Sequence, residues 1–192
     1  GYFDPVWYLS AYRELQERVV DPLEFHAEQG FARGYDPGPD FSTSGYALIS
    51  AGTCPTGEDS LLHFLRYGRA AGLEPLPVFA GFPDEFTDRP WVCLCDEPGS
   101  ARLPHAERTL LDLMAALQRL RWNTLTLLPN AIHPNYVERV RKRAQAVAVV
   151  PYAEWYEGRR TFSRTVEHIQ SLLRRYRVRL VHVNGARLDE PL

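Results

Sequence analysis

Residues with catalytic or ligand-binding chemistry follow a short apolar run, WVCLC, at 91–95. The next loop carries five of them: Asp96, Gly99, Ser100, Arg102 and His105. A glycine beside a serine allows a ligand to approach the backbone closely, and an arginine pairs with phosphate oxygens. Asp96 or His105 could remove a proton from a substrate hydroxyl as a general base. The alternative is that Asp96 and Ser100 cap the turn and His105 caps the next helix.

Two further loops hold candidate binding residues. Trp155 and Arg159, within YAEWYEGRR, offer an aromatic platform and a cation that suit a carbohydrate or a phosphate, although loop packing would use the same residues. Asn184 and Gly185 stand where another apolar run ends and could contact a sugar. The loop after WVCLC lacks the GxGxxG pattern, so we expect no dinucleotide and predict no cofactor.

These loops follow strand-like segments in a region where strands and helices alternate. Apolar runs lie at 91–95, 124–129, 145–151 and 179–184, with helical patterns between them. Such alternation is typical of a parallel sheet covered by helices on both faces, and we predict the strand order 3-2-1-4. Ligands of open parallel sheets bind beyond the carboxyl ends of the strands, where the candidate residues fall. The predicted fold class is α/β with a Rossmann-like parallel sheet, preceded by an all-α module.

The first part of the chain repeats itself at a constant spacing. When Phe3 is placed on Phe41, six further positions coincide: Tyr8/Tyr46, Leu23/Leu61, Gly30/Gly68, Ala32/Ala70, Gly34/Gly72 and Pro37/Pro75. In each copy, cap residues precede two helical patterns, and the second pattern ends at a glycine. We therefore predict two tandem helical hairpins over residues 1–76, with the recurring aromatic residues in their core.

The histidines and cysteines do not predict a metal site. His26 and His63 sit among apolar neighbours, and a zinc site needs more ligands at fixed spacing. Among the three cysteines, Cys93 and Cys95 alternate along one strand and are expected to face the same side as small buried thiols. The odd number of cysteines, with no signal peptide and no apolar run of about 20 residues, favours a reducing cytoplasm.

Charge is distributed unevenly along the chain. Residues 1–90 include 6 basic and 14 acidic residues, whereas residues 91–192 include 16 basic and 10 acidic ones. The proline-rich segment 77–90 between the two parts is expected to be an irregular linker with little helix or strand. The basic part could face a phosphorylated substrate, a membrane surface or the acidic part. Nucleic acid is not expected, because exposed aromatic residues do not interleave with the arginines. We expect one basic cluster to be exposed: Arg139, Arg141, Lys142 and Arg143.

Two segments resemble a known class of enzyme. FDPVWYL with DPLEFHAEQGFARGYDP, and the degenerate second copy, resembles the paired helical repeats that precede bacterial glycosyltransferases of surface polysaccharide biosynthesis. WVCLCDEPGSARLPHAERTLLDLMAAL with RLVHVNGARLDEPL is similar to the N-terminal half of GT-B glycosyltransferases of the family 4 type. Together the two resemblances cover nearly the whole chain, with residues 91–192 as a Rossmann-like acceptor domain.

The resemblance implies a sugar transfer from a nucleotide-sugar donor to a glycan, lipid-linked or phosphosugar acceptor. It also implies that a second domain, beyond Leu192, binds most of the donor, so we interpret the chain as the N-terminal part of a cytoplasmic enzyme that could lie against the inner membrane. One wall of a two-walled cleft is expected to be inactive alone. The alternative is a non-catalytic module that docks on a protein or membrane, with the Rossmann-like part as a scaffold.

Overall fold

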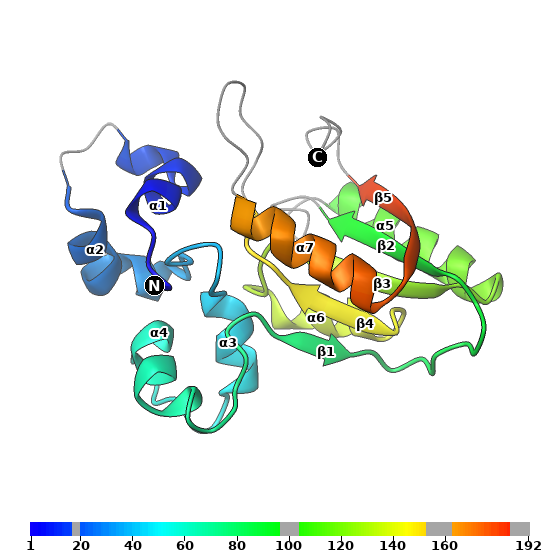
Figure 1. Cartoon of the computed structure of the whole chain (residues 1–192), viewed down its shortest axis with the longest axis horizontal. Helices are drawn as coiled ribbons and strands as arrows, with labels where there is room; N and C mark the ends of the chain where they lie inside the picture. Colours follow the sequence, from blue (N-terminus) through cyan, green and yellow to red (C-terminus); the bar gives the residue numbers. More distant parts are fainter. Residues whose placement is uncertain (17–19, 97–103, 153–162, 185–192) are drawn as a thin grey trace. The chain divides into compact units, whose positions relative to one another are not determined.

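The chain forms two compact units, Gly1–Pro77 and Val78–Leu192. The computed structural model describes residues 1–16, 20–96, 104–152 and 163–184 (Figure 1). The first unit is helical and the second is built on a five-stranded, mostly parallel sheet. The fold class is therefore α/β and compatible with a Rossmann-like fold.

The sheet has the strand order β1-β4-β3-β2-β5. Its strands are β1 (Val78–Ala80), β2 (Trp91–Asp96), β3 (Asn123–Leu128), β4 (Ala146–Val149) and β5 (Val178–Asn184). β4, β3, β2 and β5 pair with one another in parallel, in this order, which confirms the predicted order of the four parallel strands.

The segment 77–90 contains a strand that the sequence did not predict. β1 pairs antiparallel with β4 and extends the edge of the sheet. It was not predicted because a run of only three residues gives no periodic signal. Arg141 holds it there: its Nε donates to the carbonyl oxygen of Ala80 at 3.1 Å, and its guanidinium lies over the rings of Phe79 and Phe82.

Helices cover the two faces of the sheet in Figure 1. Helix α7 (Ser163–Arg175) lies on one face, while α5 (Pro104–Arg119) and α6 (Pro134–Arg141) lie on the other. On the α7 side, Ile169 and Leu172 share a core cluster with Cys93 and Cys95. The sulfur atoms of these two cysteines are 4.0 Å apart and both side chains are buried, which confirms the expectation for them.

Two expectations about burial are wrong. The helical pattern between the first two apolar runs predicts that Leu120 continues its apolar stripe, with Leu110 and Met114. Leu120 is instead 65% exposed, because the helix ends at Arg119 and Arg121 turns the chain away with a φ of 57°. β5 was predicted to be buried on both faces, yet Leu180 is 54% exposed. β5 stands at the edge of the sheet, so a neighbouring strand flanks it on one side only.

The helical unit has four α-helices, each with its N-terminus capped by a side chain. Asp4 and Asp21 cap α1 (Pro5–Ala11) and α2 (Pro22–Phe25), and Ser42 and Asp59 cap α3 (Thr43–Ile49) and α4 (Ser60–His63). A 3₁₀ turn, η1 (Arg13–Leu15), follows α1. α2 continues into a π-helical turn, η2 (His26–Gly30), and then a 3₁₀ turn, η3 (Phe31–Arg33). α4 continues into a second π-helical turn, η4 (Phe64–Gly68). The four predicted caps are confirmed.

Many contacts of this unit occur twice, at equivalent positions of the two copies. The backbone N–H of Asp4 donates to Pro37 at 3.0 Å, and that of Ser42 donates to Pro75 at 2.9 Å. Gly34 and Gly72, the predicted C-terminal glycines, both adopt the left-handed conformation, with φ of 76° and 75°. An aromatic cluster also forms in each copy, one around Tyr8, Leu15 and Phe25 and the other around Phe41, Tyr46 and Phe64.

Candidate functional site

Asp96 and Asn184 lie side by side at the carboxyl end of the sheet. Asp96 is the last residue of β2 and Asn184 the last residue of β5, and the two pair in register. The Nδ2 of Asn184 donates to Oδ1 of Asp96 at 3.3 Å. Both side chains are buried, and the Asp96 side chain is not exposed at all. Two of the residues predicted from different loops are thus brought together.

Two tyrosines complete the surroundings of Asp96. The hydroxyl of Tyr136, on α6, donates to Oδ2 of Asp96 at 2.6 Å. The hydroxyl of Tyr152, which follows β4, contacts the main-chain carbonyl oxygen of Asp96 and lies 3.1 Å from that of Leu127. Burial, and then the neighbouring Cys95 and Asp96, hold the pKa of Tyr152 well above its usual value, so this hydroxyl keeps its proton.

This arrangement holds a carboxyl group rigidly at the point where a ligand of a parallel sheet would bind. Each oxygen of Asp96 accepts a hydrogen bond, from Asn184 and from Tyr136. A carboxyl oxygen can accept more than one hydrogen bond, so these two bonds restrain Asp96 without using all of its acceptor sites. As it stands, the carboxyl group orients the amide of Asn184 and the hydroxyl of Tyr136.

The other predicted site residues cannot be placed in the same way. Six of them lie outside the described residues: Gly99, Ser100, Arg102, Trp155, Arg159 and Gly185. For His105 only the backbone is described, in the first turn of α5. The sequence pointed to neither Tyr136 nor Tyr152, although Tyr152 comes directly after the apolar run of β4 and its proline, where a strand-end residue is expected.

The basic cluster of α6 is exposed in part. Arg139 and Lys142 are exposed, and Arg139 pairs with Glu107 of α5. Arg141 and Arg143 are half-buried. Arg141 is held by the segment 78–82, a packing role that the sequence did not indicate because β1 was not foreseen.

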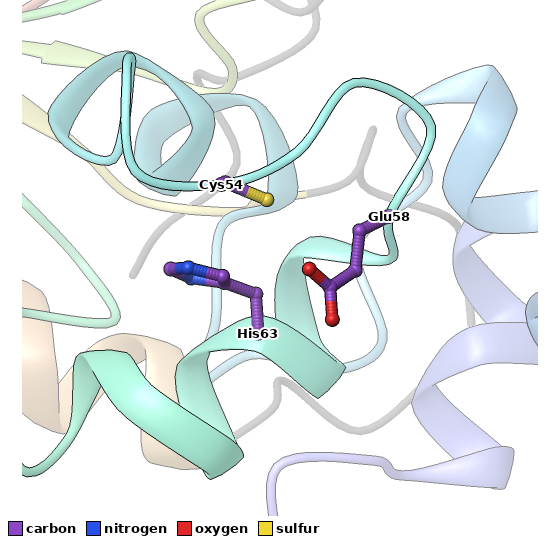
Figure 2. Close-up of side chains that lie close together, drawn as sticks. All are labelled: Cys54, Glu58 and His63. Carbon is purple, nitrogen blue, oxygen red and sulfur yellow. The ribbon is translucent and has the colours of Figure 1, made fainter.

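A second group of polar side chains lies in the helical unit, between α3 and α4 (Figure 2). Cys54, Glu58 and His63 offer metal-ligand atoms that all lie within 4.8 Å of one another. Nδ1 of His63 lies 2.8 Å from the hydroxyl of Tyr46, and its Nε2 lies 3.2 Å from the carbonyl oxygen of Thr53. Burial, and then Cys54 and Glu58, raise the pKa of Tyr46, so its hydroxyl also keeps its proton.

The histidine of the first copy is placed differently from His63. His26 is buried, and neither ring nitrogen has a hydrogen-bond partner among the described residues. Its Nε2 is 3.9 Å from a carboxylate oxygen of Asp59. Burial lowers the pKa of His26, and the charge of Asp59 opposes this effect.

Comparison with protein-family models, with curated proteins and with solved structures found no match. Within the described parts of the chain, no helix combines the length and the apolar character that crossing a bilayer requires.

Proposed function

We propose that the unit 78–192 is the acceptor-binding part of a GT-B glycosyltransferase that uses a nucleotide-sugar donor. The observation that carries this proposal is the position of Asp96 and Asn184. β3 and β4 follow β2 on one side of it, whereas β5 lies on its other side, so the strand order reverses between β2 and β5. Open parallel sheets bind their ligands in the crevice at such a reversal, and these two residues stand there.

The chemistry of the site suits a sugar better than a nucleotide. The site combines the amide of Asn184, the hydroxyl of Tyr136 and the carboxyl group of Asp96, and sugar hydroxyls both donate and accept hydrogen bonds. A pyrophosphate needs cations or backbone N–H groups, which these three side chains do not supply, so we expect the sugar ring of an acceptor, and not its phosphate, to contact them. This supports a glycan, lipid-linked or phosphosugar acceptor, with the donor bound by another domain.

In the same proposal, residues 1–76 are tandem helical repeats of the kind that accompany such transferases. Three features that occur in both copies support this interpretation: the helix caps, the left-handed glycines Gly34 and Gly72, and the aromatic clusters. The surface polysaccharide as the product follows from the resemblance of the sequence, and the cytoplasm as the compartment follows from that resemblance and from the cysteine pattern.

The test is an NMR titration of the purified chain with a hexose 1-phosphate and, separately, with uridine diphosphate. We expect the side-chain amide of Asn184 to shift with the sugar phosphate, at an affinity of about 1 mM, since half a cleft removes little of a ligand from water. Asn184→Ala should abolish the accompanying shifts of the neighbouring backbone amides, which remain observable in this variant. Asn135→Ala makes the same change at an exposed position of α6 and should not.

Uridine diphosphate should bind far more weakly than to a complete transferase. Micromolar binding of the nucleotide, or turnover of a nucleotide-sugar by this chain, would place the donor site here and contradict the proposal. A response to the sugar phosphate that survives Asn184→Ala would contradict the assignment of the site. No response to either ligand would favour the alternative, a docking module with a Rossmann-like scaffold.

A further inference from the structure

The loop between α3 and α4 brings three side chains of metal-ligand type together (Figure 2). The ligand atoms of Cys54, Glu58 and His63 lie within 4.8 Å of one another; His63 is buried and the other two are half-buried. Zinc binds at about 2.0–2.3 Å from each ligand, which places tetrahedral ligand atoms roughly 3.5 Å apart. Small rotations of the two half-buried side chains are enough to reach this geometry.

The backbone places these residues without help from a ligand. The N–H of Cys54 donates to Ser50 at 3.0 Å and that of Glu58 donates to Pro55 at 3.1 Å, so two successive turns fix the loop. Asp59 then caps α4 through the N–H groups of Leu61 and Leu62. The third ligand follows at the end of this short helix. The site is therefore preorganised by turn and cap chemistry.

The hydrogen bonds of His63 identify the nitrogen that can bind a metal. The carbonyl oxygen of Thr53 can only accept, so Nε2 carries the proton and donates to it. Nδ1 then has the free lone pair, which accepts from the hydroxyl of Tyr46. A histidine that donates one N–H to a backbone carbonyl and binds metal through the other nitrogen is the usual arrangement in metal sites. A metal on Nδ1 replaces only the hydrogen bond from the Tyr46 hydroxyl, which keeps its proton and turns away.

The charges around the loop favour a cation. Burial, and then the negative charges of Glu58 and Asp59, raise the pKa of the Cys54 thiol, so two carboxylates act on this loop. Arg66 lies 3.5 Å from Glu58, but its side chain is more than half exposed, so water screens this pair. A metal ion would replace a screened partner of Glu58 by a direct bond.

We propose that Cys54, Glu58 and His63 bind one divalent cation of the zinc class, through Sγ, a carboxylate oxygen and Nδ1. Sulfur and imidazole ligands select zinc and similar ions over magnesium or calcium, which prefer oxygen. Binding replaces the thiol proton by the metal and releases that proton to water. Three protein ligands leave the fourth tetrahedral position open to water or to a group from a partner. This site is independent of the function proposed for the sheet.

The experiment is a titration of the chelator-treated, purified chain with Co²⁺, which substitutes for zinc and reports its ligands by absorption. We expect one Co²⁺ per chain, with a thiolate-to-cobalt charge-transfer band and tetrahedral visible bands. Zn²⁺ should displace the Co²⁺ and raise the melting temperature, because it binds the folded state alone. Cys54→Ser should remove the charge-transfer band and weaken binding more than about 100-fold, since losing even an outer partner costs about 10–100-fold.

The repeat offers matched variants for the histidine. His63→Phe places at 63 the residue found at the equivalent position of the first copy, Phe25, so the fold has a precedent for it, and binding should be lost. His26→Phe makes the same change in the first copy, where Phe64 is the precedent, and should leave binding unchanged. Glu58 is half-buried in the loop, so Glu58→Gln should weaken metal binding without affecting the circular dichroism spectrum.

Several results would overturn the proposal. One is the absence of Co²⁺ binding at a dissociation constant of about 100 µM or tighter. Another is a charge-transfer band that survives Cys54→Ser, which would place the metal on Cys93 and Cys95. Equal loss of binding in His26→Phe and His63→Phe would show a general effect on folding instead of a ligand role.

Discussion

The hydroxyl oxygen of Tyr46 lies 2.1 Å from the position that a Cβ on Gly68 would occupy. The same relationship holds at the same distance between Tyr8 and Gly30, the equivalent pair of the first copy. The two pairs differ in how firmly the tyrosine is held. Tyr46 is bonded to His63 at 2.8 Å, whereas no hydrogen-bond partner contacts the Tyr8 hydroxyl among the described residues. Both glycines are therefore needed for space, but the second copy has less freedom to adjust.

We predict that Gly68→Ala lowers the free energy of unfolding by about 2–3 kcal/mol, because the added methyl group overpacks a fixed ring. Gly30→Ala should cost less, since Tyr8 can tilt away without breaking a hydrogen bond. Urea denaturation of the two variants measures the difference. Adding Tyr46→Phe should reduce the cost of Gly68→Ala. Alanine normally stabilises a helix relative to glycine where no neighbour blocks its methyl group. If both variants are more stable than the original protein, the close tyrosine contacts do not exclude a side chain at positions 30 and 68.

His26 should make the helical unit sensitive to acid. Burial lowers its pKa below the ordinary value of 6.5, so the unfolded chain binds a proton before the folded chain does. The contribution of the neutral His26 ring to the free energy of unfolding is complete above pH 6.5. It falls as the pH drops below this value and levels off only below the lowered pKa of the folded state. Three groups face the imidazole of His26: the phenol ring of Tyr8, the ring of Phe3 and the carboxylate of Asp59.

His26→Phe removes this titration and should flatten the acid slope of the unfolding free energy between neutral pH and the lowered folded pKa. Phe64 fills the corresponding position of the second copy, so the ring should fit. Asp59→Asn is the complementary variant: without the opposing charge, the pKa of His26 should fall further and the slope should steepen. A slope that neither variant changes would assign the acid sensitivity to other groups.

Much of the sheet could be predicted from the sequence because its signals are local or topological. Short apolar runs between helical patterns identify buried strands, and the rules for parallel connections then restrict their order. β1 was not predicted because three residues carry no period, and it is stabilised by pairing with the edge of β4 and by the side chain of Arg141. The predicted order already placed the strand that contains Leu180 at an edge, so its exposure was missed because this edge strand was expected to be covered as fully as the inner strands.

The candidate site was predictable only where position along a strand determines it. Asp96 and Asn184 end apolar runs, so the topology brings them together. Tyr136 comes from a helix, and nothing in its neighbours signals that its hydroxyl reaches a carboxyl group 40 residues earlier. The group of Cys54, Glu58 and His63 follows no familiar spacing, because two turns and a short helix bring its members together.

Asp36 should destabilise the protein at neutral pH. Its side chain is buried, which raises its pKa to about 8, and Oδ1 accepts the backbone N–H of Thr43 at 2.7 Å. The unfolded chain loses this proton near its ordinary pKa of 3.8, so the stability contributed by the neutral carboxyl group is complete below that value. It is lost as the pH rises through about 8.

Asp36→Asn keeps a neutral acceptor for Thr43 at every pH. We expect it to match the original protein near pH 4 and to exceed its unfolding free energy by about 1–3 kcal/mol at pH 8. Asp36→Ala leaves the N–H of Thr43 without its acceptor and should cost about 1–3 kcal/mol at both values. Parallel pH profiles for the original protein and Asp36→Asn would show that this carboxyl group titrates normally.

The hydrogen bonds of Asp96 predict different outcomes for two substitutions. Asp96→Ala removes the acceptor of the Tyr136 hydroxyl and of the Asn184 amide, both buried, and should lower the unfolding free energy by about 3 kcal/mol. Asp96→Asn can still accept from Tyr136 through its oxygen. If the side-chain amide of Asn184 turns over, its oxygen can accept a hydrogen bond from the new amide at position 96. The cost should therefore be about 1 kcal/mol or less.

Because Asp96→Asn remains folded, it separates two roles of the carboxyl group. If Asp96 only positions Asn184, the variant should bind a hexose 1-phosphate as the original protein does, and Tyr136→Phe should weaken binding more than Asp96→Asn. If the carboxylate itself contacts the sugar, Asp96→Asn should lose the shift of the Asn184 amide while keeping its melting temperature. Thermal denaturation and the NMR titration on the three variants distinguish these cases. Equal loss of stability in Asp96→Asn and Asp96→Ala would mean that the negative charge, and not the hydrogen-bond pattern, holds these strand ends together.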